Sequence, residues 1–273
     1  STLRLSAGSG YRIAQVFTED HAALSGAREV VFTENLNPEK SWNSNLNYIQ
    51  KFFLKQGIII DLDLSLFKNN FSNKIIPDYE TDPNKIIYNN LNGKSISNGI
   101  SINTNLTFQG DIRINLGVTY IDTYTEENGV KTIPYLTERF QGVWKLEKKW
   151  MATDLAIDIT GNTTGELRLP TLGKLDPRPK YSDTFNIFNI QLTKEWNKSF
   201  KTYGGIKNIF DFTPPKNSIA RSFDPFDLEV VFDKSGNALS SSNNPYALTF
   251  DPTYVYTSNQ GIRFFFGLQW QLK

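Results

Sequence analysis

The sequence contains few side chains that could carry out covalent chemistry. His21, which follows Asp20, is its only histidine, and there is no cysteine. An Asp–His pair can act as a general base, but a catalytic site of this kind also needs an acidic pair facing it, for which the sequence gives no specific signal. The absence of cysteine excludes disulfides, thiolate nucleophiles and cysteine zinc sites. We therefore expect that the chain is not an enzyme and that His21 is a solvated loop residue.

Carboxylates in the stretch 211–258 suggest a second kind of chemistry. Asp224, Asp227 and Asp233 are candidate calcium ligands because Ca²⁺ prefers oxygen donors. Their spacing does not match an EF-hand, so solvated loop charge is the competing interpretation. Beyond this structural calcium, no cofactor is expected.

Basic and aromatic side chains in the predicted loops are candidates for binding rather than catalysis. Arginine and tyrosine make strong contacts at low entropic cost with a bulky anionic or aromatic ligand. The stretch 211–258 is the longest predicted loop, and connections of this length are usually functional or disordered, so we expect a ligand-capturing lid there. The competing interpretation is a loop that only caps the structure. The candidate substrate-binding residues are Arg12, Arg178, Tyr181, Arg221, Phe223, Tyr246 and Tyr254.

Charge and hydropathy exclude two broad classes. The formal net charge of +1 leaves no basic field, so no nucleic-acid partner is expected. No run approaches the roughly 18 apolar residues of a membrane-spanning helix. Aromatic residues make up 14% of the 273 residues, which is typical of a β protein with many turns.

The elements that would position these residues follow a period of two. From Arg263 to the end of the chain, one side is wholly apolar and the other is mostly polar, which predicts a β-strand. The same alternation places Leu64 on an apolar side and Asp63 on a polar one. About ten strands are expected, near 2–10, 42–54, 58–69, 100–108, 112–120, 139–146, 154–160, 188–193, 200–210 and 262–272.

Connections between these strands alternate strictly between short and long. Short turns are predicted near 55–57, 109–111, 147–149 and 197–199, and long loops near 11–39, 71–94, 125–136, 163–183 and 211–258. This order predicts an up-and-down antiparallel sheet with all short turns at one end. The positions of the tryptophans support this arrangement, because indole rings favour the boundary between water and lipid. Trp42 lies near the long-loop end, and the short-turn end has Trp144, Trp150, Trp196 and Trp270.

Together these patterns predict a transmembrane barrel. The strands are about 10–14 residues long, against the usual 5–6 of soluble proteins, and can cross the roughly 25 Å apolar band of an outer-membrane barrel. In such a barrel Leu64 would face lipid near the middle of the membrane and Asp63 the interior.

Several stretches resemble the TonB-dependent outer-membrane receptors. Gly267-x-x-Trp270-x-Leu272 is similar to the C-terminal assembly signal of outer-membrane proteins, although Lys273 replaces the usual terminal aromatic residue. LRLSAGSGYRIAQVFTED resembles a strand and loop of those receptors, and the segments 36–41 and 203–211 resemble their "L-x-P-E-x-S" and "V-x-N-L-F-D" patterns. The stretches DPRPKYSDTFNIFNIQLTKEW and FTPPKNSIARSFDPFD resemble Bacteroidota members of the siderophore and vitamin B12 branch.

This resemblance implies a barrel of about 22 strands closed by an N-terminal plug. Residues 1–273 would be its C-terminal part, and the plug and the earlier strands would lie outside this chain. The protein would sit among the lipids of a Gram-negative outer membrane and work with the TonB complex through the plug. Its function would be active import of a ferric siderophore, a corrinoid or haem.

Two alternatives stay open at this point. One is a SusC-like importer of glycans or peptides that works with a surface lipoprotein. The other is a self-closed ten-stranded outer-membrane protein, either structural or enzymatic.

Overall fold

The computed structural model describes residues 1–13, 15, 28–33, 36–82, 84–171, 176–221, 230–235 and 237–271. His21, Phe223, Asp224 and Asp227 lie outside the described residues, so the predictions made for them stay predictions. Within the described part of the chain, no helix is long and apolar enough to cross a membrane.

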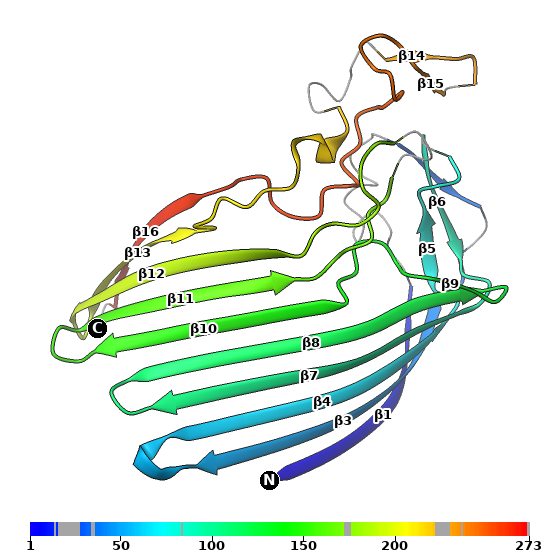
Figure 1. Ribbon diagram of the computed structural model, residues 1–273. Helices are drawn as coiled ribbons and strands as arrows, with labels where there is room; N and C mark the ends of the chain where they lie inside the picture. The colour runs from blue at the N-terminus through cyan, green and yellow to red at the C-terminus, as the bar shows by residue number, and fades with distance from the viewer. Residues whose placement is uncertain are drawn as a thin grey trace.

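One large antiparallel sheet dominates the molecule (Figure 1). Its ten principal strands follow the chain order, and each coincides with one of the predicted segments, so the predicted strand count is confirmed. They are β1 (Thr2–Arg12), β3 (Glu39–Phe53), β4 (Ile59–Ser72), β7 (Lys94–Phe108), β8 (Ile112–Glu127), β10 (Phe140–Trp150), β11 (Leu155–Thr164), β12 (Phe185–Asn197), β13 (Phe200–Lys207) and β16 (Arg263–Trp270).

Short and long connections lie at opposite ends of this sheet, as predicted (Figure 1). The short ones are the 3₁₀ turn η2 (Lys55–Gly57) and the turns at 109–111, 151–154 and 198–199. The third turn was predicted at 147–149, which is wrong. Those residues continue β10, where Glu147 pairs with Arg113 on β8 and Lys149 pairs with Glu195 two strands away on β12. Trp144 consequently lies within β10 rather than at its end.

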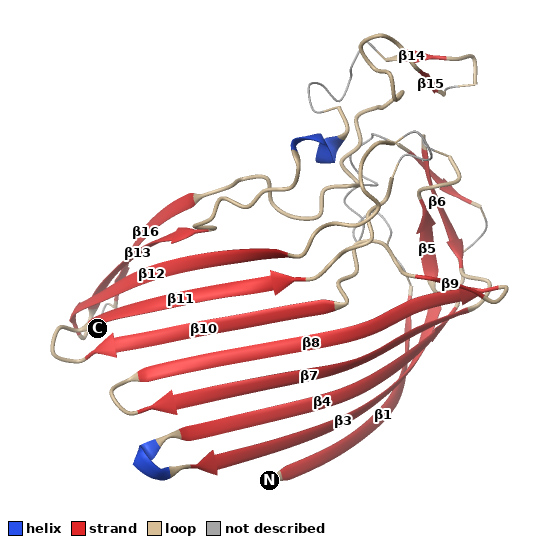
Figure 2. Cartoon of the chain, viewed as in Figure 1, coloured by secondary structure: helices blue, strands red, loops and turns tan. Residues whose placement is uncertain are grey.

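The sheet is open within the described residues. β1 and β16 form its two edges, and each is paired on one side only, β1 with β3 and β16 with β13. The self-closed alternative would require these two edges to pair with each other. Figure 2 shows the sheet as a curved wall with both edges uncovered.

The two faces of the sheet differ in chemistry. On the polar face, the carboxylate of Asp63 accepts a hydrogen bond of 2.5 Å from the side-chain amide of Asn47. Leu64 lies on the opposite, apolar face, level with Tyr48 on β3 and Ile102 on β7. Large side chains on the apolar face remain exposed; they include Leu46, Leu66, Ile100, Ile102, Leu116, Val118, Leu146, Leu192, Phe264, Phe266 and Leu268.

The glycine of the C-terminal stretch has a packing role on the polar face. Gly267 of β16 pairs with Tyr203 of β13. A Cβ at Gly267 would lie 2.3 Å from Cζ of the Tyr203 ring, closer than atoms can approach. Only glycine lets the tyrosine ring fold across this strand.

The long connections contain secondary structure that the sequence patterns did not predict (Figure 2). β2 (Glu29–Phe32) pairs in parallel with β6 (Lys85–Asn90), which pairs in turn with β5 (Ile75–Asp78). β9 (Val130–Thr132) extends β8 as a hairpin. The 3₁₀ turn η3 (Lys216–Ile219) and the hairpin of β14 (Val231–Phe232) and β15 (Ala238–Leu239) lie between β13 and β16.

The hydrophobic core of the described residues sits at this loop end. One cluster is Tyr79, Ile86 and Tyr88, which packs against Val30, Ile75 and Tyr135. A second cluster is Leu167, Leu169, Phe185 and Tyr254, with Ile187, Phe212 and Tyr256 around it. The loops therefore fold on one another as a globular protein does, whereas the described residues of the sheet beneath them form no comparable core.

Candidate functional site

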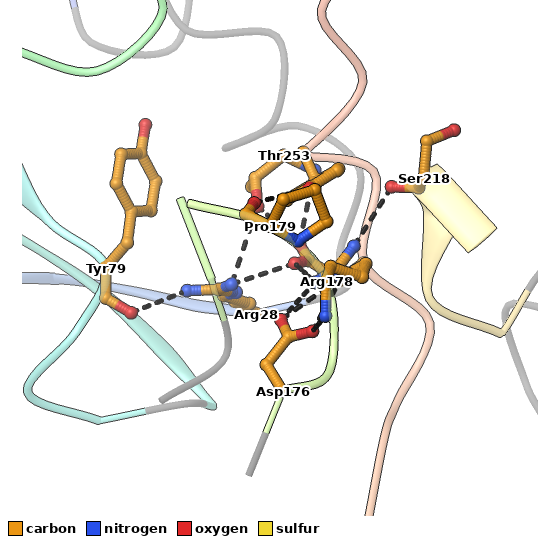
Figure 3. A network of polar contacts seen from close by, with 9 residues as sticks. Arg28, Tyr79, Asp176, Arg178, Pro179, Ser218 and Thr253 are labelled. Carbon is orange, nitrogen blue, oxygen red and sulfur yellow. Dashed lines mark hydrogen bonds and ion pairs between the residues drawn. The ribbon is translucent and has the colours of Figure 1, made fainter. Parts of the chain in front are cut away.

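We use the name loop cluster for the described residues of the five long connections, 13–38, 73–93, 128–139, 165–184 and 208–262. They gather at one end of the sheet (Figure 1). A network of buried charged groups joins four of them (Figure 3).

Arg178 is the centre of this network. Its Nε donates to Asp176 Oδ1 at 3.0 Å and its Nη2 to Asp176 Oδ2 at 2.8 Å, a two-pronged ion pair. Its Nη1 donates to the carbonyl oxygen of Ser218 at 3.0 Å. Arg178 thus joins the connection before β12 to the connection before β16.

Arg28 extends the network to two further connections. Its Nη2 donates to Asp251 Oδ2 at 2.8 Å, and its Nη1 donates to the carbonyl oxygen of Tyr79 at 3.0 Å. Asp251 Oδ2 also lies 3.6 Å from Nη2 of Arg178. The two arginines therefore share the carboxylate of Asp251.

Tyr254 closes the network from one side. Its ring lies 4.1 Å from the guanidinium carbon of Arg178, a cation–π contact. Its hydroxyl donates to the carbonyl oxygen of Pro179 at 2.5 Å. Burial raises the pKa of the Tyr254 hydroxyl to about 12, because the phenolate would lose its hydration.

Arg168 connects the remaining long loop, between β8 and β10. Its guanidinium donates to the carbonyl oxygen of Ile133 at 2.7 Å and to Glu80 Oε1 at 2.9 Å. It also lies 4.2 Å from the centroid of the Tyr135 ring. All five long connections are consequently joined by arginine side chains.

Burial decides what this network can do. The side chains of Asp176, Arg178 and Asp251 are 0% exposed and that of Arg28 is 1% exposed. Two arginines and two aspartates sum to zero charge, which is how buried charges are normally tolerated. These groups fasten the loops to one another and are not available to a ligand in this structure.

The predicted substrate-binding residues are only partly brought together. Arg178 and Tyr254 are in contact but buried, and Arg221 is also buried. Tyr181 and Tyr246 are exposed on the loop cluster, where a ligand could reach them.

Arg12 lies apart from these residues, at the end of β1. It forms an ion pair with the buried carboxylate of Glu39, whose other oxygen accepts a hydrogen bond of 2.8 Å from the backbone of Ile75. Arg12 also lines an open cavity on the sheet edge together with Lys74 and Phe71. Burial lowers the pKa of the Lys74 ammonium, while the Glu39 carboxylate acts in the opposite direction.

Asp233, the described member of the predicted calcium set, is engaged in a turn. Its carboxylate accepts hydrogen bonds of 2.8 Å from the backbone N–H groups of Ser235 and Asn237. Within the described residues, no group of three or more acidic or histidine side chains could hold a metal ion. The calcium site therefore stays a prediction for the residues outside this part.

A second polar network crosses the polar face of the sheet near the short turns. Lys145 Nζ lies 2.8 Å from both Glu147 and Asp158. Glu195 forms ion pairs with two further lysines, Lys149 and Lys201. All these side chains are partly exposed, unlike those of the loop cluster. Its members are Arg113, Lys145, Glu147, Lys149, Asp158, Glu195 and Lys201.

Sequence reasoning did not find Arg28, Asp176 or the role of Asp251. A signal was present, because both aspartates precede proline in an Asp-Pro-x stretch. In each, the carboxylate accepts a hydrogen bond from the backbone N–H two residues on, at 3.0 Å for Asp176 and 3.1 Å for Asp251. This is the Asx turn, which Asp-Pro favours. Arg28 carries no comparable sequence signal.

A model of the family described as "TonB dependent receptor-like, beta-barrel" matches residues 1–209. No curated protein sequence matches the chain. Solved structures do resemble it. The pyoverdine outer membrane receptor FpvA from Pseudomonas aeruginosa PAO1, bound to pyoverdine, aligns with a TM-score of 0.58 and 11% identity over 99% of this chain and 34% of that one.

Two other structures are similarly close. A mutant of the ferric enterobactin receptor of Pseudomonas aeruginosa, in complex with enterobactin, has a TM-score of 0.59 and 15% identity, covering 98% of this chain and 38% of that one. The copper transporter OprC has a TM-score of 0.57 and 10% identity, covering 78% and 32%. The chain spans about one third of the length of these structures. At such identities the likeness concerns the fold alone.

Proposed function

The chain belongs to the TonB-dependent receptor β-barrel family, and on this premise we propose that it forms part of an importer of a scarce nutrient. Proteins of this family are outer-membrane β-barrels, so the chain lies in the outer membrane. They are receptors and transporters, and we assign no covalent chemistry to this one. One observation carries the proposal: an antiparallel sheet, apolar on one face, has every long connection at the same end.

The same arrangement supports assigning a different environment to each part of the chain. The apolar face would contact lipid, because exposed leucines and phenylalanines are stable only against a nonpolar solvent. The loop cluster would lie outside the cell, since outer-membrane barrels have long extracellular loops and short periplasmic turns. The polar face would line the interior.

We propose further that residues 1–273 are the C-terminal part of a barrel of about 22 strands. The two uncovered edges at β1 and β16 support this, because hydrocarbon offers no partners to unpaired backbone groups. Preceding strands of the receptor would cover both edges. An N-terminal plug would then fill the interior and connect the receptor to TonB.

The proposed cargo is a ferric siderophore, a corrinoid or haem. Tyr181 and Tyr246 are exposed and would contact such a bulky ligand, and the partly exposed guanidinium of Arg12, which is paired with Glu39, would offer hydrogen-bond donors at the edge of the sheet. The hairpin of β14 and β15 presents Val231 and Phe232 to solvent and would act as part of the lid. The sequence stretches around 175–196 and 212–227 favour the Bacteroidota siderophore and vitamin B12 branch.

An uptake assay tests this proposal. Cells that lack the receptor gene would be supplied in turn with labelled ferric siderophore, cobalamin and haem. We expect uptake of one of these classes to be lost and to return with the intact gene. Unchanged uptake of all three would contradict the proposed function.

A variant without the β14–β15 hairpin tests whether this part of the loop cluster binds the substrate. Replacing 230–240 by a short flexible linker would remove the β14–β15 hairpin but keep Ser218 and Asp251, the network contacts on either side. We expect correct insertion and binding at least about tenfold weaker, or about 1.4 kcal/mol. Unchanged affinity would leave the hairpin as a cap with no part in binding.

A further inference from the structure

Two lysines on the apolar face, near the short turns, differ from the other lysines around them. Lys148 on β10 is level with Ile112 and Ile157, and Lys194 on β12 is level with Leu155. Both therefore point to the same side as the exposed leucines. Within the described residues, neither forms an ion pair.

Three lysines near them on the polar face are paired with carboxylates. Lys149, which follows Lys148 in the chain, lies 3.1 Å from Glu195, and Lys201 lies 2.8 Å from the same carboxylate. Lys145 has two carboxylate partners. Within the described residues, carboxylates thus neutralise these three lysines on the polar face, whereas Lys148 and Lys194 on the apolar face have no such partner.

Lys148 and Lys194 each make the same two contacts, one with a turn carbonyl and one with a tryptophan ring. The Lys148 ammonium donates to the carbonyl oxygen of Gly110 in the preceding short turn, at 2.5 Å, and lies 5.8 Å from the ring of Trp150. The Lys194 ammonium donates to the carbonyl oxygen of Thr153 in its own preceding short turn and lies 5.4 Å from the ring of Trp196.

These two contacts hold each lysine ammonium in place and leave some of its N–H donors able to bind another group. A lysine ammonium has three N–H donors, and the turn carbonyl uses one of them. The indole of Trp196 is itself fixed, because its Nε1 donates to Thr202 at 3.0 Å. Two residues from each cation, towards the middle of the sheet, Leu146 and Leu192 are exposed on the same face. A phosphate at the ammonium and an acyl chain along the leucines would fit this surface.

We propose that Lys148–Trp150 and Lys194–Trp196 form two binding sites for the phosphate of an anionic phospholipid in the periplasmic leaflet. β11 separates the two sites, and at about 4.8 Å per strand they lie roughly 10 Å apart across the sheet, so each would take its own headgroup. This inference rests on the proposed membrane orientation, in which the short turns face the periplasm. The membrane would supply the counter-charge that the protein omits.

The experiment uses the whole receptor that contains this chain, in lipid nanodiscs of neutral and anionic phospholipid. Lipids that remain bound after gentle detergent extraction are counted by native mass spectrometry. A lysine near an anionic surface contributes about fivefold in affinity. We therefore expect the wild type to retain phosphatidylglycerol over phosphatidylcholine and Lys148→Gln/Lys194→Gln to lose most of this preference.

Two control variants separate a site from general charge. Lys198→Gln removes the same charge from the exposed turn at this end and is expected to keep the preference. Lys148→Arg/Lys194→Arg is expected to keep it as well. Equal retention by the wild type and by the Lys148→Gln/Lys194→Gln variant would overturn the proposal, and so would an equally large loss in Lys198→Gln.

Further outcomes keep the test decisive. If the double glutamine variant does not assemble, the wild type alone decides, because equal retention of neutral and anionic phospholipid overturns the sites. With lipid A added to the nanodiscs, retention of lipid A in place of phospholipid would overturn the assigned leaflet and hence the proposal. A receptor that does not enter a bilayer would refute the proposed function, whereas normal insertion without lipid preference would refute only this inference.

Discussion

The loop cluster and the sheet hold charged groups in opposite ways. In the loop cluster, Arg178 and Asp176 are wholly buried and each polar end has a partner. On the polar face of the sheet, Lys145 and Asp158 form a pair of similar length but remain partly exposed. The distances between the charged atoms are nearly equal, so burial is the main difference between the two pairs.

Apolar groups show the reverse distribution. The loop cluster buries tyrosines, leucines and a phenylalanine in two compact groups. The sheet leaves its leucines, isoleucines and phenylalanines exposed along one face. A protein surrounded only by water would bury the leucines, isoleucines and phenylalanines of the sheet in preference to the tyrosines of the loop cluster. The contrast therefore indicates two solvents, water around the loops and lipid around the sheet.

The largest expected effect comes from breaking the buried network. Arg178→Met would remove the two-pronged partner of the buried Asp176 carboxylate and one of the two arginines beside Asp251, and breaking a buried pair typically costs about 3–5 kcal/mol. We expect the loop cluster to open while the sheet stays assembled. Limited proteolysis of intact cells should cut the long connections, while the receptor keeps its heat-resistant migration in gels.

An exposed ion pair serves as the matched control for this variant. Arg139 lies 3.2 Å from Asp122, with side chains 45% and 49% exposed. Arg139→Met should leave the loops as resistant to protease as in the wild type, because exposed pairs contribute about 0–1 kcal/mol. Equal sensitivity of both variants would show that burial is not the reason for the difference.

The next largest effect concerns the apolar face. Leu64→Arg places a cation against lipid near mid-membrane, where the cost is about 2–4 kcal/mol. Asp63→Asn, one residue away on the polar face, should be much milder. Urea unfolding of the receptor in vesicles measures both, and a larger loss for Asp63→Asn would reverse the assigned faces.

A pH effect should separate the loop cluster from the sheet. The pKa of Tyr254 is raised by burial to about 12, above the value near 10 of an unfolded tyrosine. Its contribution is fully present below pH 10 and is lost as the pH rises from about 10 to about 12. Protease sensitivity of the loops should therefore increase in this window.

Tyr254→Phe is the control for that titration. Phenylalanine cannot ionise, so the part of the alkaline opening that depends on this residue should disappear. If the variant opens with the same pH midpoint and steepness as the wild type, another group is responsible.

The smallest effect is expected on the polar face. Lys145→Met removes a partly exposed cation that pairs with Glu147 and Asp158, and should change the free energy of unfolding by no more than about 1 kcal/mol. The same urea experiment applies. A loss as large as that of Arg178→Met would erase the distinction between the two regions.

Much of the sheet could be predicted from the sequence because its information is local. Alternation assigns each side chain to a face, and the register then follows from the turns, so Leu64 and Asp63 were placed on opposite faces correctly. The turn after β10 was misplaced because Glu147-Lys148-Lys149 reads as a polar turn when taken alone. Glu147 and Lys149 form ion pairs with residues on other strands, and the pattern of one strand alone cannot reveal such partners.

The loop cluster was far less predictable, because its contacts join distant residues. Arg28 and Asp251 are 223 residues apart in the chain, and no local pattern relates them. Arg178 and Tyr254 were selected as substrate contacts on residue type alone, and the structure buries both. Residue type identifies a side chain that binds strongly, but only the fold determines whether its partner is a ligand or another loop.

The central claim is that the apolar face of the sheet contacts lipid, and cysteine labelling tests it most directly. The chain has no cysteine, so a fluorophore can be attached at single positions along β4, beginning with Asp63→Cys, Leu64→Cys, Ser65→Cys and Leu66→Cys. We predict that a quencher dissolved in lipid acts on positions 64 and 66 and a water-soluble quencher on 63 and 65. Quenching that is reversed, or equal at all four positions, would contradict the claim.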